Sequence, residues 1–212
     1  MVLGLNGVIT LSPHGLLMSN TTPQISTVVT YLEMHARPVT PAPPRPALPL
    51  ALLRVCNIPV SFYRYLYETV GEAWFWYERR MIDDATLSTI VHDEGAKIYV
   101  IYVDGAPGGY GELMKTENNT VDLAYFGLLP DFIGRGLGRY FLRYMVDQAW
   151  GLDPIRITVN TCDLDHPCAL KVYQKTGFSV YRREIKQFED PRSIGILEDW
   201  QDPRLNQGHE NY

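Results

Sequence analysis

The sequence predicts one α+β domain with a mixed, mostly antiparallel central sheet flanked by helices, and three observations indicate this class. Runs rich in β-branched and aromatic residues alternate along the chain with segments of helical periodicity. Asp104-Gly105 is a two-residue hairpin signal between strands expected at 97–103 and 109–115. The next strand, expected at 121–129, is almost wholly apolar, as a strand covered on both faces should be.

The other elements follow from local signals. A first strand is expected at 26–35. Residues 38–50 are rich in proline, which lacks an N–H group and restrains the residue before it, so we expect an extended surface strap there. Pro130 should end the central strand, because proline cannot donate to a ladder. The remaining expected elements are helices from Asn57 to Gly71 and from Asp84 through Val91, a buried helix that includes Leu137 and Asp147, a strand at 155–160, a helix at 166–176 capped by Asp165, and a strand at 178–187.

These signals divide the chain into three parts. Residues 1–25 are expected to be a poorly ordered extension, 26–188 the folded domain and 189–212 a tail.

No stretch reaches the roughly 20 apolar residues of a membrane helix, and the N-terminus lacks the pattern of a signal peptide. The net charge of −5 argues against a nucleic-acid partner, and three cysteines suit a reducing compartment. We therefore expect a cytoplasmic protein with neither a nucleic-acid nor a membrane partner, and leave a homodimer open.

A glycine-rich segment lies between the central strand and the buried helix. It reads Gly134-Arg135-Gly136-Leu137-Gly138. Glycines let backbone approach a ligand, and the first N–H groups of a helix have no partner inside it, so the segment is suited to a pyrophosphate. A tight turn explains such a segment equally well. It is not a P-loop, because the lysine and hydroxyl residues that should follow are missing.

Two motifs in this region resemble those of the GNAT acetyltransferase family. Leu128-x-Pro130 followed by Ile133-Gly134-Arg135-Gly136-Leu137-Gly138 is similar to its acetyl-CoA signature, V-x-P-x-x-[QR]-x-x-G-x-[GA]. Downstream, Ala169-x-x-x-Tyr173-x-x-x-Gly177-Phe178 is similar to its second motif. The match covers roughly residues 80–188. It implies a GNAT-like three-layer α/β/α fold and N-acetyl transfer from acetyl-CoA to an amine.

The resemblance also implies roles for individual residues. Backbone groups around Leu128 should pair with the pantetheine arm like an extra strand, and one N–H should polarise the thioester carbonyl. Arg135 is favoured over Arg139 as a phosphate contact, although both also suit an exposed helix face. The predicted cofactor contacts are Gly127, Leu128, Leu129, Ile133, Gly134, Arg135, Gly136, Leu137, Gly138, Arg139, His166 and Tyr173.

Tyr173 should be the general acid that protonates the leaving thiolate. A phenol with a pKa of about 10 stays protonated at neutral pH, yet it can pass its proton to a thiolate whose conjugate acid has a pKa of about 8.5. A plain aromatic core residue is the alternative. Direct transfer in a ternary complex is expected, because no Cys–His pair with a third orienting group can be recognised.

Two positions depart from the family pattern. Ile133 stands where the family usually has Gln or Arg, so only its backbone can contact the cofactor. His166 stands where an Asn often begins the last helix. We expect it to face the cofactor groove at the helix start.

The acceptor amine must lose a proton before it attacks. Glu112 is the first choice as base, because its strand should border the acceptor cleft. Asp122 and Glu78 are the alternatives, and each of the three also fits a solvated charge. Trp76 and Tyr125 are expected to contact the acceptor. Their neighbours Trp74 and Tyr77 either line that pocket or anchor the loop.

A metal site is not expected. Cys162, His166 and Cys168 lie close together, but structural zinc usually has four ligands and no second pair is visible. The acceptor is left open between a small molecule and a peptide. Two rival functions also remain: a non-catalytic acyl-CoA-binding module, and an interaction domain that uses the proline strap.

Overall fold

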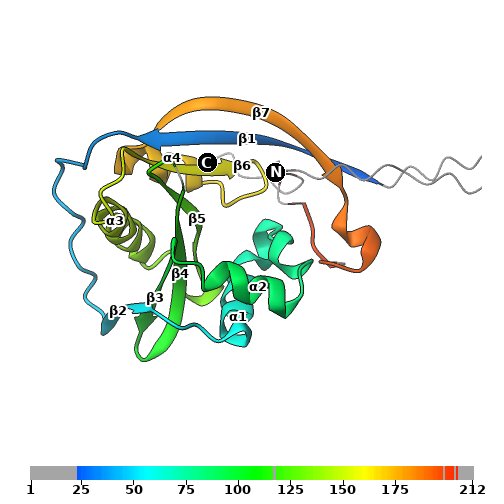
Figure 1. Cartoon of the computed structure of the whole chain (residues 1–212), viewed down its shortest axis with the longest axis horizontal. Coiled ribbons are helices and arrows are strands. Elements are labelled where there is room, and N and C mark those ends of the chain that lie inside the picture. The colour runs from blue at the N-terminus through cyan, green and yellow to red at the C-terminus, as the bar shows by residue number, and fades with distance from the viewer. Residues whose placement is uncertain (1–22, 117, 198, 203, 205–212) are drawn as a thin grey trace, which may run out of the picture.

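The computed structural model describes residues 23–204 except 117, 198 and 203. In this part of the chain one sheet has the strand order β2-β3-β4-β5-β6-β1-β7. The strands are β1 (Gln24–Met34), β2 (Leu50–Val55), β3 (Ala96–Val103), β4 (Ala106–Lys115), β5 (Thr120–Leu128), β6 (Arg156–Cys162) and β7 (Ser179–Glu189). The α-helices are α1 (Val60–Gly71), α2 (Asp84–Val91), α3 (Leu137–Trp150) and α4 (Ala169–Thr176) (Figure 1).

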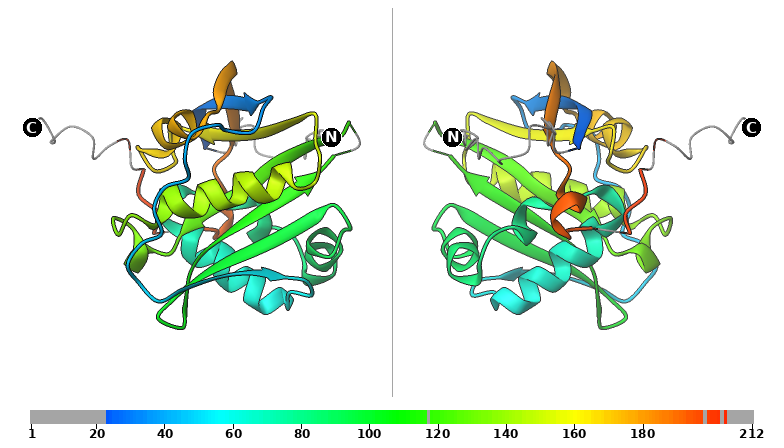
Figure 2. Two further views of the ribbon diagram at one scale, coloured as in Figure 1. Left: turned by 90° about the vertical axis from the view of Figure 1, so that its left-hand side faces the viewer. Right: turned by 90° about the vertical axis from the view of Figure 1, so that its right-hand side faces the viewer.

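Helices cover both faces of the sheet. Figure 2 shows α3 in front of the sheet in its left view, and α1 and α2 on the opposite face in its right view. A core between the sheet and α3 includes Phe141 and Met145, and a second core beneath α1 and α2 includes Tyr63 and Leu87. Among the described strands, β5 and β6 alone pair in parallel; the other neighbours are antiparallel. The predicted fold class, a mixed sheet in three layers, is confirmed.

Local signals at the turns account for the central strands. Asp104 and Gly105 have φ of 51° and 84° between β3 and β4, as a two-residue hairpin of type I′ requires. β5 ends at Leu128, and Pro130 opens a short 3-10 helix, Pro130–Phe132. The proline therefore ends the ladder where the sequence predicts.

The first strand lies far from the elements that follow it in sequence. β1 pairs with β6 along one edge and with β7 along the other, so it sits between the last two strands. The proline-rich strap then carries the chain past α3 to β2 at the opposite edge of the sheet (Figure 1). Arg143 of α3 holds the strap, since its Nη1 donates to the Thr40 carbonyl at 2.7 Å.

Two segments differ from the sequence predictions. β2 begins at Leu50, the last residue of the expected strap, and no strand is expected there; half of the Leu53 side chain is exposed, so the strand lacks a clear apolar face. The helix expected at 166–176 begins only at Ala169.

The C-terminal segment packs against the domain. Trp200 is buried, and its ring centroid lies 4.3 Å from that of Phe75. Its indole N–H donates to the carbonyl of Ala73 at 3.2 Å. Ile25 and Leu164 complete this third core. Most of the predicted N-terminal extension, and the tail beyond residue 204, lie outside the described residues.

Candidate active site

The two parallel strands separate and open a cleft. The described pairing of β5 with β6 is limited to three residues of each strand, Thr120–Asp122 of β5 and Arg156–Thr158 of β6. Beyond that point β5 remains on β4 and β6 remains on β1, so each strand follows its other neighbour and the two diverge. At the apex the Thr158 hydroxyl donates to Asp122 Oδ1 at 2.6 Å.

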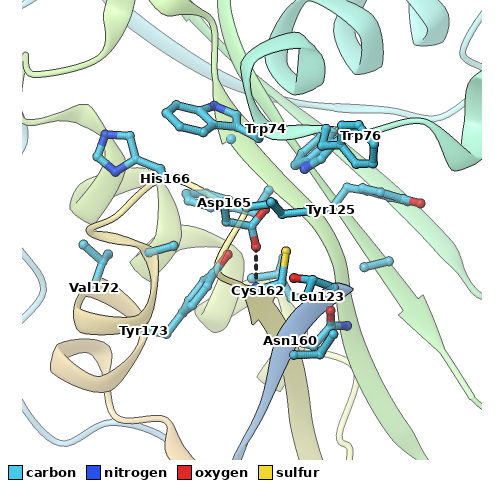
Figure 3. A pocket seen from close by; sticks show the side chains of 18 of the residues that line it. Trp74, Trp76, Leu123, Tyr125, Asn160, Cys162, Asp165, His166, Val172 and Tyr173 are labelled. Atoms are coloured by element: carbon cyan, nitrogen blue, oxygen red, sulfur yellow. Dashed lines mark hydrogen bonds between the residues drawn. The ribbon is translucent and has the colours of Figure 1, made fainter. Parts of the chain in front are cut away.

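The cleft has a volume of about 950 Å³ and a mostly apolar lining. Its walls come from both diverging strands and from α4, and Figure 3 shows side chains from these elements converging on it. Residues near the start of α3 lie at one end, and the loop between α1 and α2 lies at the other. The lining includes Leu123 to Leu128, Gly138 and Arg139, Cys162, Tyr173, and Trp74 to Glu78.

The edge of β5 offers backbone groups to the cleft. The Leu129 amide donates to the Gly108 carbonyl at 3.0 Å, which turns it towards β4. Antiparallel pairing alternates, so the backbone groups of Phe126 and Leu128 face the cleft. Leu128 can therefore pair with a pantetheine arm as predicted. Leu129 cannot, because its amide is engaged and its side chain is buried in the second core.

Gly127 lines the cleft and is also required by the packing of α1. A Cβ atom there would lie 2.3 Å from Cγ1 of Val70, so only glycine lets α1 approach β5 this closely.

The glycine-rich loop presents free N–H groups at the start of α3. Gly134 and Gly136 have φ of 79° and 76°, a region that L residues with a Cβ rarely occupy. No side chain caps α3, and the amides of residues 134–139 donate to no described backbone or side-chain acceptor. Together with the helix dipole they make an anion site that fits the pyrophosphate of coenzyme A.

Side chains around this loop refine the predicted contacts. Arg139 lines the cleft, whereas Arg135 stacks over the Phe132 ring at 5.3 Å and does not line it. The positions of the two side chains therefore favour Arg139, and not Arg135 as predicted, as the phosphate contact. Ile133 lines the cleft with a partly exposed side chain.

Tyr173 lies in the wall formed by α4. Its side chain is buried, and its hydroxyl bonds to no residue in the described part of the chain. Burial, reinforced by the carboxylates of Asp165 and Asp122, raises the pKa of this phenol. The hydroxyl therefore remains protonated at neutral pH, as a general acid must be.

His166 faces the cleft at the turn before α4. Its Nδ1 accepts the Cys168 amide at 3.1 Å, so the neutral imidazole carries its proton on Nε2. The ring packs edge-on against Trp74 with centroids 5.0 Å apart. His166 thus lines the cleft from the turn before α4, three residues ahead of the helix start at Ala169.

Asp165 is a cleft residue that sequence reasoning missed. It was predicted to cap the last helix, but its Oδ2 turns back to accept the Thr161 hydroxyl at 2.7 Å and the Cys162 amide at 2.8 Å. Burial raises the pKa of the carboxyl, and hydrogen bonds from Thr161, Cys162 and Trp76 partly offset this. Its place just before His166, which was expected to face the cofactor groove, was the available signal.

Glu112 lies elsewhere. It is fully buried, accepts the Tyr63 hydroxyl at 2.6 Å and pairs with Arg79 at 3.0 Å. It lines a separate polar hollow of about 420 Å³, together with Asp122. The strand register turns it towards α1, so the geometry does not support its predicted role as the base.

The third candidate base and the predicted acceptor contacts do line the cleft. Glu78 is exposed and accepts the Tyr125 hydroxyl at 2.8 Å. The rings of Tyr125 and Trp76 are 5.1 Å apart. A Cβ on Gly71 would overlap Trp76 at 2.4 Å, so this glycine admits the indole. Trp74 and Tyr77 line the cleft as well.

Within the described residues neither a metal site nor a reactive Cys162 thiol is found. No group of three or more His, Cys, Asp or Glu side chains there is arranged to hold a metal ion. Burial raises the pKa of the Cys162 thiol to about 11, which keeps it from acting as a nucleophile at neutral pH.

Among the helices described, none combines the length and apolar character needed to cross a membrane.

Comparisons with known proteins agree with this geometry. A functionally unknown conserved protein from Staphylococcus epidermidis has the same fold, with 14% identity and a TM-score of 0.52 over 79% of this chain and 63% of that chain. A GCN5-related N-acetyltransferase from Sphaerobacter thermophilus matches with 16% identity and a TM-score of 0.54 over 77% of this chain and 51% of that chain. Another from Kribbella flavida matches with 14% identity and a TM-score of 0.55 over 82% of this chain and 63% of that chain. This chain thus spans between half and two thirds of their lengths. No curated protein matches the sequence. Residues 54–178, more than half of the chain, match the acetyltransferase (GNAT) family model, and the chain therefore belongs to the GNAT acetyltransferase family.

Proposed function

We propose that this chain moves an acetyl group from acetyl-CoA to a primary amine of a small molecule or peptide, by direct transfer in a ternary complex. The observation that carries the proposal is one continuous cleft. It joins the free amides of residues 134–139, the open backbone edge at Leu128 and the hydroxyl of Tyr173. Anion binding, thioester alignment and proton donation to the leaving group are three of the tasks that this reaction requires.

Each region of the cleft would perform one of these tasks. The amides of residues 134–139, with Arg139 beside them, would hold the pyrophosphate. The Leu128 backbone would align the pantetheine arm and donate an N–H to the thioester carbonyl. Acetyl-CoA supplies the activated acetyl group, and Tyr173 would donate a proton to the departing sulfur.

Gly138→Asp tests the cofactor site without strain. A Cβ at position 138 meets only Leu128 Cδ1, at 3.8 Å, and an acidic residue in the first turn favours a helix by about 0.3–1 kcal/mol. The variant should therefore melt no lower than the parent. Its carboxylate would nevertheless repel the pyrophosphate. Gly138→Ala adds a methyl group without the charge and serves as the matched control.

The measurement is thermal unfolding with and without acetyl-CoA. A ligand at about 100 times its Kd stabilises a protein by about 2.7 kcal/mol, which for this size raises the midpoint by about 5–11 °C. The parent and Gly138→Ala should show most of this rise, and Gly138→Asp should show none. No rise in the parent at saturating acetyl-CoA would refute the proposal. A rise without turnover on any amine would indicate a binding module instead.

A further inference from the structure

The acceptor end of the cleft is walled by aromatic rings. Trp76 packs against two tyrosines, with ring centroids 5.5 Å from Tyr67 and 5.1 Å from Tyr125. Trp74 and Tyr77 extend this wall on the same loop. An aromatic ligand gains edge-to-face and offset contacts with such rings beyond what its buried area supplies, whereas an aliphatic chain gains only the area.

Negative charge at this end is sparse. Glu78 and Asp165 are the acidic side chains of the described lining, and Glu78 is exposed and occupied by the Tyr125 hydroxyl. Lys186 also lines the cleft, although Glu184 partly neutralises it at 3.6 Å. A polycationic acceptor needs several carboxylates, because each desolvated ammonium group must be paired. This wall offers one withdrawn carboxylate, which suits a single ammonium group.

Asp165 is that carboxylate, and Figure 3 shows it between Tyr173 and Trp76. Its Oδ2 accepts two hydrogen bonds, from Thr161 and Cys162, and the Trp76 side chain also approaches the carboxyl as a donor. A carboxylate has about four acceptor sites, so Asp165 has acceptor capacity left. The carboxylate is therefore anchored and can still receive a donor from the cleft. The position places an amine bound to Asp165 close to the proposed acid, Tyr173.

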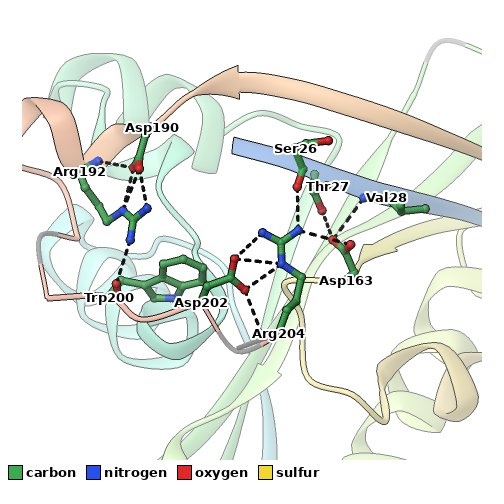
Figure 4. Close-up of polar contacts among 9 residues, drawn as sticks. All are labelled: Ser26, Thr27, Val28, Asp163, Asp190, Arg192, Trp200, Asp202 and Arg204. Carbon is green, nitrogen blue, oxygen red and sulfur yellow. Dashed lines mark hydrogen bonds and ion pairs between the residues drawn. The ribbon is translucent and has the colours of Figure 1, made fainter. Parts of the chain in front are cut away.

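Contacts with β1 and with the C-terminal segment hold the loop that carries Asp165. Asp163 accepts the Thr27 hydroxyl and, at 3.2 Å, the Val28 amide, both from β1. Arg204 of the C-terminal segment pairs with Asp163 at 3.5 Å and donates to the Ser26 carbonyl at 2.7 Å (Figure 4). These contacts hold the loop in place before any acceptor arrives, so Asp165 is preorganised.

We infer that the acceptor is a monoamine with an aromatic body, whose ammonium group binds Asp165 and whose ring packs against Trp74 and Trp76. The inference rests on the proposed acetyl transfer and names its substrate class and base. Asp165 takes one proton from the ammonium, and the freed lone pair forms the C–N bond as the C–S bond breaks. Tyr173 protonates the sulfur, and the second nitrogen proton returns through solvent to the phenolate.

The test compares four probes on the full chain. They are 2-phenylethylamine, hexylamine, spermidine and the uncharged 2-phenylethanol. Binding is measured by calorimetry and turnover by thiol release from acetyl-CoA. We expect 2-phenylethylamine to have a kcat/KM up to about tenfold above hexylamine, the limit of the ring–ring gain, and above spermidine as well. The alcohol should bind more weakly than the amine and release no thiol. A preference for spermidine or hexylamine would overturn the inference.

Substitutions then separate the two carboxylates of the cleft. Asp165→Asn keeps the acceptor oxygen for Thr161 and Cys162, but it should lower kcat/KM for 2-phenylethylamine by about 10²–10⁴-fold, the range for a lost general base. Asp153→Asn, on an exposed turn remote from the cleft, is the matched control and should match the parent. A larger loss in Glu78→Gln than in Asp165→Asn would assign the base to Glu78 and contradict the inference.

Failure of the inference differs from failure of the proposed function. If acetyl-CoA raises the melting temperature but no aromatic amine binds, the acceptor inference is refuted and the cofactor site stands. If 2-phenylethylamine binds in an Asp165-dependent manner while acetyl-CoA produces no rise, the acceptor site stands and acetyl transfer is refuted.

Discussion

The two halves of the cleft are built from different parts of the chain. The half proposed to bind the cofactor, called the cofactor half, is largely backbone: the edge of β5 at Leu128 and the amides of residues 134–139. The acceptor half is largely side chains, with Trp76 from one loop, Tyr125 from β5 and Asp165 from the loop before α4. Backbone recognition suits a ligand that is constant, whereas side-chain recognition can change with the acceptor.

This difference decides what a sequence can reveal. A backbone site needs glycine at positive φ and proline at a strand end, and both leave a local pattern at fixed spacing. A side-chain site assembled from distant loops leaves none. Substitutions in the two halves should therefore change different measured quantities.

Of the changes that follow, the largest effect is expected for Tyr173, which lies where the two halves of the cleft meet. Tyr173→Phe removes the proton donor and keeps the ring that packs beside Phe178. The kcat should fall by about 10²–10³-fold, while the thermal shift with acetyl-CoA stays as in the parent. Steady-state thiol release and melting curves measure the two quantities. An unchanged kcat would remove Tyr173 from the mechanism.

Glu112→Gln should separate a structural carboxylate from a catalytic one. The change leaves Arg79 without its ion-pair partner, and breaking a buried pair costs 3–5 kcal/mol. Arg79 retains some solvent contact, so about 3 kcal/mol is expected from denaturant unfolding. The kcat of the folded variant should match the parent. A loss of kcat without a loss of stability would return Glu112 to the list of bases.

Trp200→Phe should affect only the acceptor half. It removes the hydrogen bond to the Ala73 carbonyl behind the aromatic loop, worth about 1 kcal/mol. We expect a several-fold rise in the KM for the amine and an unchanged KM for acetyl-CoA. Equal changes in both KM values would show that the third core supports the whole cleft.

The smallest effect is expected from Thr161→Val, and it depends on pH. Thr161 donates to Asp165, and that bond favours the charged carboxylate and lowers its pKa. Its loss should raise the pKa of Asp165 further. Because the base must be unprotonated, the acidic limb of kcat/KM should move to higher pH, with the plateau unchanged. A pH–rate profile measures the shift; an unmoved limb would argue against Asp165 as the base.

The local backbone features of the cleft were easier to predict from the sequence than the face of a strand residue or the pairing of distant strands, for physical reasons. The hairpin at Asp104-Gly105 and the glycine loop follow from local backbone preferences. The face of Glu112 could not be read from its sequence, because a bulge between Glu112 and Leu113 changes the alternation of β4 against β5. The position of β1 between β6 and β7 is a long-range pairing with no local signal.

The most direct test of the cofactor half is amide hydrogen exchange by NMR with and without acetyl-CoA. Binding should slow exchange at residues 134–139 and at Leu128, whose N–H groups are free in the cleft. Leu129 should change little, because its amide already donates to the Gly108 carbonyl. Protection confined to other parts of the chain, or none at saturating acetyl-CoA, would contradict the assignment of this cleft to the cofactor.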